Sequence, residues 1–460
     1  MLPLWRELDA GLPMHRLFTA FLRDRYPLFL DSSLPHPRLG RYSYIMADPF
    51  LVLRSKGGRT RVESRTDLFW LEGDPFEHLR ILMAPFRAES LPELPPFQGG
   101  AAGYFGYDLG QHTERLPRVA LDDLGLPDMV IGLYDWVLAS DHATARTWLL
   151  SSPFPDGDYQ RASRRMEEIA GRLADPAVLS LPQCDIGHGL RSNFSREGYL
   201  AAVQRAKEYI AAGDIYQVNL SQRFQIPMPA SPWALYCRLR DRSPVPFSAY
   251  LDLEDVVVAS VSPELFLRKD GRRVETRPIK GTRPRGRTPE EDVALAQQLL
   301  GSEKDRAENV MIVDLLRNDL GKVCTVGSVR VPGLCVLESY STVHHLVSSV
   351  EGILDEQYDA LQLLQACFPG GSVTGCPKIR AMEIIDELEP TRRGVYCGSI
   401  GYLGFNGSLC SNIVIRTAVI RDGWIYFQVG GAVVADSDPE AEYQETLDKS
   451  RSLTLALEGW

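Results

Sequence analysis

The sequence predicts an α+β fold, in which hairpin-connected antiparallel strands are interspersed with long helices. Three Asp-Gly or Asn-Gly pairs, at 270–271, 406–407 and 422–423, stand between strand-like runs, and such pairs favour β-hairpin turns. Two segments, 158–173 and 195–213, instead repeat apolar residues at helical spacing. Consecutive hairpins form antiparallel sheet, and these helices do not alternate strictly with strands. The pattern therefore favours α+β over α/β.

The chain divides, on this pattern, into a strand-rich N-terminal subdomain, 1–190, and a second domain, 191–460, intertwined with it. The loop-like stretch 174–189 marks the boundary. Ser195 is expected to cap the helix that follows, and Gly213 to end it.

Two stretches beyond the boundary have features of interest. Residues 216–226 alternate apolar and polar side chains, which predicts a half-buried strand with one polar face. The pair Gly430-Gly431 is expected to break a strand and to let a backbone approach a ligand closely. The runs "SNIVIRTAVI" and "WIYFQV" are expected to be strands joined by the last hairpin turn.

Composition and charge exclude several classes of protein. The 460 residues are 44% hydrophobic and 24% charged, as in an ordinary soluble enzyme. No run is long enough to span a membrane, and no secretory leader is evident, so we expect a cytoplasmic protein that does not bind membranes. The eight cysteines form no C-x-x-C pair, which argues against zinc ribbons and redox motifs. A net charge of −10 argues against nucleic acid as a partner, while an anionic small substrate stays open.

An acidic helix near the C-terminus is the first candidate for chemistry. Asp438 is a plausible N-cap, and Glu442, Glu445 and Lys449 then share one face. A solvated face with an ion pair is the ordinary explanation. The functional alternative is a Mg²⁺ site, because this ion prefers carboxylates and water and leaves room for an anionic substrate.

Two other acids support the metal and acid–base interpretations. Glu308 lies where the predicted helix 302–321 changes from charged to apolar, a position from which a carboxylate can face a cleft. Glu264 follows the apolar strand "VVVASV", where burial could raise its pKa and make it an acid.

The glycine-rich loop 370–375 precedes a predicted helix at Pro377. It fails the phosphate-loop test because Cys376 stands where lysine is required. Exposed N–H groups before a helix can still bind an anion, and plain turn glycines explain the same letters equally well.

Lys280, in "TRPIKGTRPRG", raises a similar choice. A surface lysine in a basic loop is the ordinary interpretation of these letters alone.

Seven motifs, taken in order, resemble those of the chorismate-utilising enzymes: "PIKGTRPRG", "KDRAENVMIVDLLRNDLG", "VHHLVS", "FPGGSVTGCPKIRAMEIID", "GSIGYLG", "IVIRTAV" and "GGAVVADSDPEAEYQETLDK". The resemblance covers residues 193–456, and "LDSS", "GRYSY" and "GGAAGYFGYD" extend it more weakly toward the N-terminus. It implies a two-sheet, largely antiparallel orthogonal β-sandwich flanked by helices, with the site between the sheets.

The resemblance also implies roles for individual residues. Those expected to hold Mg²⁺, which binds the ring carboxylate of chorismate, are Glu308, Glu442 and Glu445. Those expected to line the substrate are Tyr402 and Arg416, at the enolpyruvyl carboxylate, with Thr374, Gly431, Ala432, Lys449 and Gln217. Those expected to be catalytic are Lys280, Glu264, which protonates the departing C4 hydroxyl, and His345.

Two positions select a branch of the family. Members that hydrate chorismate have lysine at the position of Gln217, and a glutamine side chain cannot activate water as that base does. Anthranilate synthases typically have alanine at the position of Lys280, whereas aminodeoxychorismate synthases have lysine, which can attack C2 covalently once it is neutral. The resemblance thus implies C4 amination of chorismate to 4-amino-4-deoxychorismate, for p-aminobenzoate and folate synthesis. Anthranilate synthase component I and a non-catalytic chorismate or tryptophan sensor are the alternatives.

Partners follow from the same resemblance. None of the cysteines has the G-x-C-x-G setting of a glutaminase, so ammonia is expected from a separate glutamine amidotransferase subunit. Segments around Ser32, Ser33, Tyr42 and Ser43 resemble those that form a tryptophan pocket in some relatives, although ordinary sheet packing explains the same letters.

Overall fold

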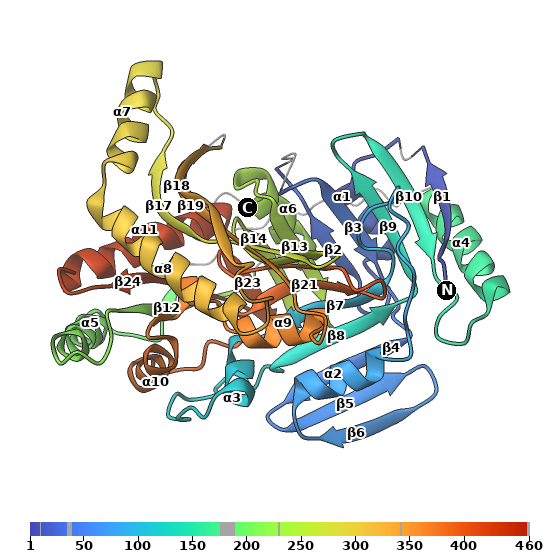
Figure 1. The fold of residues 1–460 in the computed structure, drawn as a ribbon, viewed down its shortest axis with the longest axis horizontal. Helices are drawn as coiled ribbons and strands as arrows, with labels where there is room; N and C mark the ends of the chain where they lie inside the picture. The colour runs from blue at the N-terminus through green and yellow to red at the C-terminus, as the bar shows by residue number, and fades with distance from the viewer. Residues whose placement is uncertain (10, 35–38, 175–188, 229–230, 341–342, 458–460) are drawn as a thin grey trace.

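Two large antiparallel sheets, each of twelve strands, form the protein (Figure 1). The computed structural model describes residues 1–9, 11–34, 39–174, 189–228, 231–340 and 343–457. Every ladder between its strands is antiparallel. The predicted α+β class and the two-sheet, largely antiparallel arrangement are therefore confirmed.

Sheet A comprises, in spatial order, β1 (Leu4–Leu8), β10 (Arg146–Ser151), β9 (Trp136–Asp141), β3 (Tyr42–Met46), β2 (Leu28–Asp31), β13 (Phe247–Asp252), β14 (Val257–Ser262), β23 (Thr417–Arg421), β24 (Trp424–Val433), β12 (Gln217–Pro227) and β11 (Arg191–Ser192), with β20 (Gly375–Cys376) paired to β12. Sheet B comprises β17 (Ile279–Pro284), β19 (Val343–Ile353), β16 (Arg273–Arg277), β15 (Leu265–Asp270), β22 (Leu409–Asn412), β21 (Ser399–Gly404), β7 (Gly100–Phe105), β8 (Met129–Tyr134), β4 (Leu51–Lys56), β5 (Arg59–Ser64) and β6 (Leu68–Glu72), with β18 (Arg330–Ser339) paired to β19.

Helices surround these sheets. They are α1 (Met14–Leu17), α2 (Pro75–Met83), α3 (Gly110–Thr113), α4 (Tyr159–Leu173), α5 (Arg196–Ala211), α6 (Pro232–Arg242), α7 (Pro289–Leu300), α8 (Glu303–Gly321), α9 (Ala360–Cys367), α10 (Lys378–Leu388) and α11 (Pro439–Leu457), with short 3₁₀ turns η1 (Phe18–Phe21), η2 (Tyr107–Leu109) and η3 (Gly371–Val373). Strands from both halves of the chain are neighbours in each sheet, β2 beside β13 and β21 beside β7.

The local signals in the sequence are realised where they were expected. The three hairpin turns join β15 to β16, β21 to β22 and β23 to β24, with Gly271, Gly407 and Gly423 at φ of 54°, 80° and 77°. Such left-handed backbone suits glycine. Ser195 caps α5 as predicted, and Asp158, where the predicted helix 158–173 begins, caps α4. The predicted boundary loop, 174–189, lies almost entirely outside the described residues.

Strand β12 is buried on both faces, which corrects the expected half-buried strand. Its polar residues find partners inside the protein: the backbone N–H and hydroxyl of Ser221 both donate to Glu389 Oε1 at 2.8 Å. Gln222 Nε2 donates to Thr446 Oγ1 at 2.5 Å. These partners lie more than 160 residues away in sequence, so the alternating pattern alone does not indicate them.

Two expectations about the last strands also differ from the structure. Strand β24 runs unbroken through the glycine pair, and the glycines serve close packing instead: a Cβ on Gly430 would lie 2.5 Å from the carbonyl oxygen of Leu220. The run "SNIVIRTAVI" is not one strand. It splits into β22 of sheet B and β23 of sheet A, and 413–416 crosses between the sheets.

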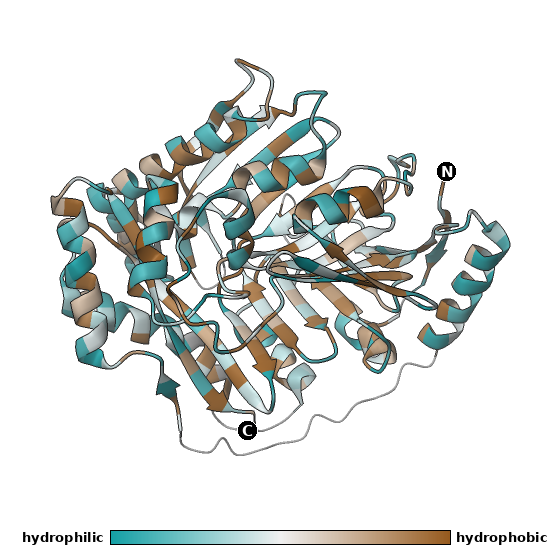
Figure 2. Ribbon diagram, turned by 90° about the horizontal axis from the view of Figure 1, so that it is seen from below, coloured by the Kyte–Doolittle hydropathy of each residue, from teal (hydrophilic) through white to brown (hydrophobic). Residues whose placement is uncertain are grey.

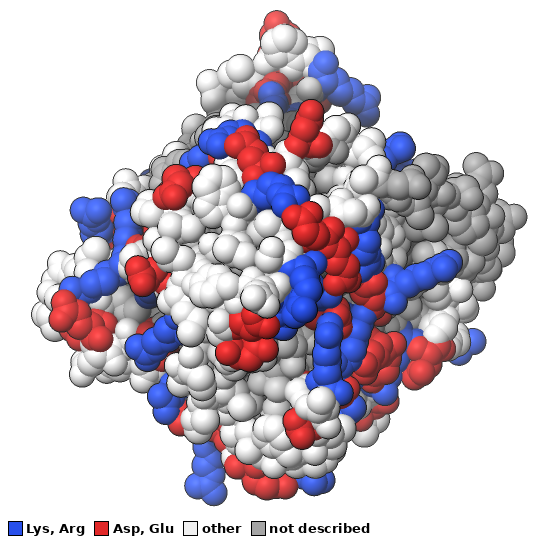
Figure 3. Space-filling model, turned by 90° about the vertical axis from the view of Figure 1, so that its right-hand side faces the viewer, with Lys and Arg blue, Asp and Glu red and all other residues white. Residues whose placement is uncertain are grey.

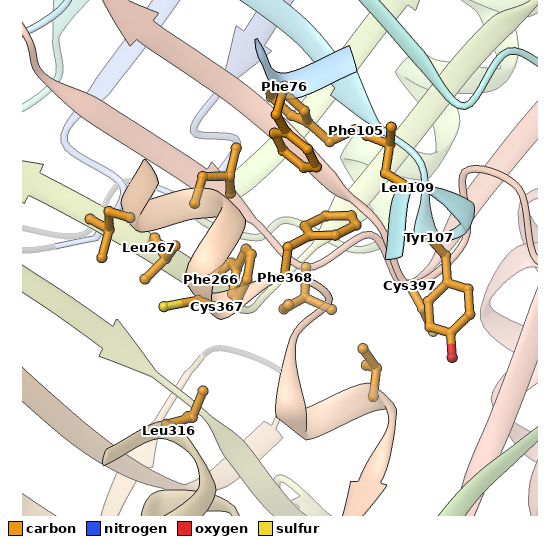
Figure 4. Close-up of a cluster of buried hydrophobic side chains, with 14 of the residues drawn as sticks. Phe76, Phe105, Tyr107, Leu109, Phe266, Leu267, Leu316, Cys367, Phe368 and Cys397 are labelled. Atoms are coloured by element: carbon orange, nitrogen blue, oxygen red, sulfur yellow. The ribbon is translucent and has the colours of Figure 1, made fainter. Parts of the chain in front are cut away.

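Buried apolar residues of strands and helices pack together in the core. Hydrophobic residues dominate most strands, whereas the helices carry both hydrophobic and hydrophilic residues (Figure 2). One part of this core supports the glycine-rich loop 370–375. There the ring of Phe368 packs 6.0 Å from that of Phe76 and 6.3 Å from that of Phe266 (Figure 4). A Cβ on Gly370 would lie 2.4 Å from the side chain of Ile413, so the loop is held tightly against the core.

The surface that carries β1 and α4 mixes acidic and basic side chains (Figure 3). They form exposed pairs, such as Arg6 with Glu167 and Arg146 with Glu7. Among the described residues, no helix is long and apolar enough to cross a membrane.

Candidate active site

Lys280 lies on β17, the strand of sheet B that leads into α7. Its ammonium nitrogen Nζ lies 2.9 Å from the carbonyl oxygen of Ser372, in the 3₁₀ turn η3. Burial lowers the pKa of Lys280, although the nearby carboxylates of Glu308 and Glu264 oppose this shift. An amine with a lowered pKa is a better nucleophile near neutral pH, because more of it is unprotonated. The ordinary interpretation, a surface lysine in a loop, is therefore wrong.

Glu264 is buried between β14 and β15, where the sequence places it after an apolar strand. Burial raises its pKa, while a hydrogen bond with the Ser372 side chain and the charge of Lys280 oppose the shift. The raised pKa favours the protonated acid that can donate a proton. Ser372 thus contacts both Lys280 and Glu264, one through its carbonyl and one through its side chain.

Arg416 and His345 complete this side of the cluster. Arg416 lies in the segment that crosses between the sheets, with a left-handed φ of 50°. Burial lowers its pKa, the charge of Glu264 opposes the shift, and no described residue offers its guanidinium a hydrogen bond or ion pair. Burial and Arg416 lower the pKa of His345 to about 4, so His345 is neutral near pH 7. Its Nδ1 lies 2.9 Å from Thr282 Oγ1.

Three carboxylates approach the cluster from two helices, Glu308 from α8 and Glu442 and Glu445 from α11. Burial raises the pKa of Glu308 and of Glu442, and the charge of Glu445 adds to both shifts. Burial acts against ionisation of Glu445 itself, but its partner Lys449, at 2.6 Å, outweighs burial and lowers its pKa. We name these seven residues the lysine cluster: Lys280, Glu264, His345, Arg416, Glu308, Glu442 and Glu445.

One carboxylate oxygen of the cluster has no partner. Glu442 Oε1 accepts a hydrogen bond from Ser437 Oγ at 2.6 Å, whereas the buried Oε2 has none. As the side chains stand, no group of three or more His, Cys, Asp or Glu among the described residues is placed to hold a metal ion. Mg²⁺ commonly binds one or two carboxylates and completes its shell with water and substrate. The free Oε2 and its acidic neighbours fit that need.

Other residues expected at the substrate have mixed positions. A Cβ on Gly431 would lie 3.0 Å from Glu442 Oε2, so this glycine lets the backbone pass beside the acids. Ala432 follows it, opposite Asn219 of β12. The hydroxyl of Thr374 is fully buried and bonded to the carbonyl oxygen of Gly370 at 3.2 Å. Lys449 Nζ donates to the carbonyl oxygen of Gly430 at 2.8 Å.

Gln217 is buried completely, and neither atom of its side-chain amide has a hydrogen-bond partner. A buried amide without partners costs free energy, which a ligand can recover. Its position at the start of β12, paired with Cys376 beyond the glycine loop, supports its place at the site.

The sequence interpretation missed two polar groups of the cluster. Lys304 lies one helical turn before Glu308, and its charge opposes the rise that burial causes in the pKa of Glu308 and of Glu442. The i,i+4 spacing of Lys304 and Glu308 was a usable signal. Ser372 acts partly through its backbone carbonyl, which no side-chain pattern indicates.

The structure does not bring Tyr402 to the lysine cluster. Its ring packs 4.4 Å from that of Phe97 and 5.4 Å from that of Tyr44, centroid to centroid. Tyr402 lies on β21 and lines a separate cavity of about 750 Å³ between the two sheets, which none of the seven cluster residues lines. We call this the Tyr402 cavity; sheet A contributes Asp31, Ser32 and Ser248, and sheet B contributes Arg268, Glu275 and Asn412.

The four residues expected in a tryptophan pocket lie at this cavity or directly behind it. Ser32 and Tyr42 line it. Ser43 is buried in the wall, where its hydroxyl accepts a hydrogen bond from the N–H of Ser32 at 2.9 Å. The hydroxyl of Ser33 is bonded to Val245 and Ser248.

A profile of chorismate binding enzymes matches residues 32–455, which include all seven residues of the lysine cluster and most of the residues that line the Tyr402 cavity. The chain belongs to the chorismate binding enzyme family.

Similar members of this family carry two different names. Aminodeoxychorismate synthase component 1 of Escherichia coli is 43% identical over 99% of this chain and 97% of its own length. Anthranilate synthase component 1 of Thermus thermophilus is 46% identical over 96% of this chain and 95% of its own. The crystal structure of anthranilate synthase component I from Streptococcus pneumoniae is 31% identical, with a TM-score of 0.81 over 92% of this chain and 94% of that one. The reaction of this family member therefore has to be argued from its site.

Proposed function

We propose that the protein is an aminodeoxychorismate synthase component, which replaces the C4 hydroxyl of chorismate with an amino group to give 4-amino-4-deoxychorismate. The observation that carries the proposal is the pairing of Lys280 with Glu264, both on Ser372. One has the lowered pKa of a nucleophile, and the other has the raised pKa of an acid. The product would serve p-aminobenzoate and folate synthesis.

Binding of the dicarboxylate uses the two ends of the cluster. The unpaired guanidinium of Arg416 can hold the enolpyruvyl carboxylate with two parallel hydrogen bonds. Glu308, Glu442 and Glu445 would hold Mg²⁺, with the unpartnered Oε2 of Glu442 as one ligand atom. When bound, this ion would neutralise the ring carboxylate and draw electron density from the ring.

The reaction then proceeds in two displacements: Lys280 first displaces the C4 hydroxyl, and ammonia then displaces Lys280. Neutral Lys280 Nζ bonds to ring C2 and loses one proton, both double bonds of the ring diene shift, and the C4–O bond breaks as Glu264 protonates the departing hydroxyl, releasing water. Ammonia next bonds to C4 and loses one proton. Both double bonds shift back, the C2–Nζ bond breaks, and the lysine nitrogen leaves with the bonding pair and regains a proton. Chorismate and ammonia give the amino product and water.

Gln217 supports amination over hydration. A neutral amide does not take a proton from water near pH 7, so the site lacks, at this position, the base that hydrating relatives have. Its two unpartnered atoms can instead hydrogen-bond to the substrate or to ammonia.

Ammonia is proposed to come from a separate glutamine amidotransferase. The relatives named above are each a component 1, which implies a second component. The cysteines on the described part of the chain are mostly buried, and burial raises the pKa of Cys367 and Cys397, which makes these thiols poor nucleophiles.

We further propose tryptophan as the occupant of the Tyr402 cavity. Its volume of about 750 Å³ lies within the range of small-molecule sites, and the rings of Tyr402 and Tyr44 offer aromatic faces to an indole.

Anthranilate synthase component 1 is the second candidate, favoured by the Thermus thermophilus relative at 46% identity. One assay separates the two. Purified protein receives chorismate, Mg²⁺ and ammonium. Anthranilate would fluoresce directly, whereas the proposed product yields p-aminobenzoate only after an aminodeoxychorismate lyase is added. Direct fluorescence would reject the proposal, and binding of chorismate without turnover would identify a sensor.

A second measurement tests the covalent step. The protein is incubated with chorismate and Mg²⁺ in the absence of ammonia and analysed by mass spectrometry. We expect an adduct on the peptide that contains Lys280. An adduct on any other lysine would contradict the assignment.

A further inference from the structure

Strand β17 holds Lys280 with an incomplete ladder. It pairs with β19 alone, and the register shifts between Ile279 and Thr282, the two residues that flank Lys280 and Gly281. Gly281 has a left-handed φ of 82°. The backbone at Lys280 is therefore not fixed by regular pairing at that point, and its position depends on how the ends of β17 are fastened.

One carboxylate fastens the C-terminal end of β17. Asp292 lies in the first turn of α7, and its carboxylate accepts hydrogen bonds from both Nε and Nη2 of Arg285 at 2.7 Å. It also accepts the backbone N–H of Gly286 at 2.8 Å. Arg285 and Gly286 follow directly after the last residue of β17, Pro284. The Arg285 guanidinium holds the pKa of Asp292 well below its usual range, so this acid stays charged.

The same carboxylate reaches the neighbouring strand. Asp292 Oδ1 lies 2.9 Å from His344 Nε2, and His344 Nδ1 lies 2.8 Å from Ser339 Oγ. These partners assign the Nε2–H tautomer, in which His344 donates to Asp292 and accepts from Ser339. Because neighbouring residues on a strand point to opposite faces, His344 faces α7 while His345 faces Thr282 and the lysine cluster.

We propose that Asp292 is a positioning residue, which fixes β17 against β19 and thereby holds Lys280 and His345 in the geometry that the reaction needs. The inference rests on the proposed function, in which Lys280 is the nucleophile. Asp292 is not one of the seven cluster residues, and its contacts are with Arg285, Gly286 and His344.

Loss of Asp292 should disturb the position of Lys280 more than the overall stability, whereas a purely structural residue would mainly affect stability. Helix α7 projects from the body of the protein (Figure 1), and Leu299 is its one buried residue. Loosening its first turn removes little from the core, so the overall stability should change little. The position of Lys280 should change more, since no regular pairing at that residue opposes a shift. A displaced nucleophile lowers kcat, whereas chorismate binding depends on residues of other elements, such as Arg416.

The test compares Asp292→Ala, Asp292→Asn and a matched control, Glu77→Gln. Glu77 also receives both Nε and Nη2 of one arginine, Arg80, at 2.6 and 2.5 Å, on the surface helix α2. For D292A we expect kcat for the 4-amino product to fall about tenfold to a hundredfold, with the KM for chorismate within about twofold. D292N keeps one acceptor oxygen for Gly286 and His344 and should recover part of the rate, and E77Q should behave as wild type.

Hydrogen–deuterium exchange gives a readout that does not require activity. Amides of residues 276–286 should exchange faster in D292A, with less change in D292N and none in E77Q. An unchanged kcat in D292A overturns the inference, as does a loss of kcat without faster exchange in this segment. If D292A does not fold, the same two readings on D292N decide. If the wild-type protein makes no 4-amino product, the proposed function fails, and the exchange measurement still tests whether Asp292 fixes β17.

Discussion

The lysine cluster and the Tyr402 cavity differ in how their charges are matched. In the cavity wall, the buried acids are paired: Asp31 accepts Arg240 Nε at 2.7 Å, and Glu275 is paired with Arg268. In the cluster, Arg416 has no partner among the described residues, and Glu442 Oε2 has none either. Unmatched buried groups cost free energy unless a ligand satisfies them. We therefore expect the cluster to bind a charged ligand and the cavity to bind a ligand without net charge.

Each region also contains a lysine whose pKa burial lowers, Lys280 in the cluster and Lys269 in the cavity. Lys269 Nζ donates to the carbonyl oxygen of Gly407, and the charges of Asp270 and Asp359 oppose the lowering of its pKa. Only Lys280 has a protonatable buried acid beside it, Glu264. A lowered pKa alone does not make a nucleophile, and its neighbours decide what it does.

The largest predicted effect is therefore the loss of Lys280. Lys280→Ala removes the nitrogen that we propose bonds to C2, so the amination rate should fall on the order of a thousandfold or more. Lys269→Ala is the matched control and should leave turnover within about twofold. Product formation is measured with the lyase-coupled assay. Equal losses in the two variants would remove the distinction between the regions.

Glu264→Gln is expected to have the next largest effect. A general acid contributes about 10² to 10⁴ in rate, so we expect kcat to fall by at least about a hundredfold. The acid is active when protonated, and burial raises its pKa above the usual value. Activity of the wild type should hence fall as pH rises through that raised pKa, and the pH–rate profile of E264Q should lack this fall. A falling limb that persists in E264Q would assign it to another group.

How much of the fold the sequence could predict depends on how far apart in the chain the interacting residues lie. The helix cap at Ser195 and the three hairpin turns are local, and the sequence predicted all of them. The polar face of β12 was misjudged, because Ser221 meets Glu389 only in the folded protein. Local patterns describe a strand's chemistry but not what covers it.

The site shows the same limit. The ordered motifs singled out the acids and Lys280, and the structure brings Glu264, Glu308 and Glu445 near Lys280. The motifs also placed Tyr402 at the substrate, but its ring stacks on that of Phe97 and lines the separate cavity. The role of Ser372 depends on its backbone carbonyl, and every residue type has one. The position of Arg416 depends on the segment that crosses between the sheets, which the local sequence pattern does not predict.

Arg416→Lys tests the difference in charge matching between the two regions and should have a smaller effect than the two preceding substitutions. Lysine keeps the positive charge but loses the planar fork that binds a carboxylate with two hydrogen bonds. A hydrogen bond to a charged group contributes about 1.5–3 kcal/mol, so the KM for chorismate should rise about tenfold to a hundredfold. Arg268→Lys, in the cavity wall, is the control and should leave this KM unchanged. A rise in KM for both variants would mean that chorismate senses the cavity as well.

The smallest effect on turnover is expected at the Tyr402 cavity. Tryptophan at a hundredfold excess over its Kd should stabilise the folded protein by about 2.7 kcal/mol, which thermal unfolding measures. Ser32→Leu places a branched side chain into the cavity and should abolish this stabilisation while kcat stays within about twofold. The variant also loses the bond from Ser32 Oγ to the Tyr42 carbonyl oxygen, worth about 1 kcal/mol, so each protein is compared with and without ligand. Full stabilisation of S32L by tryptophan would place the amino acid elsewhere. If tryptophan also competes with chorismate, it binds at the lysine cluster. In that case the two regions are not specialised for different ligands.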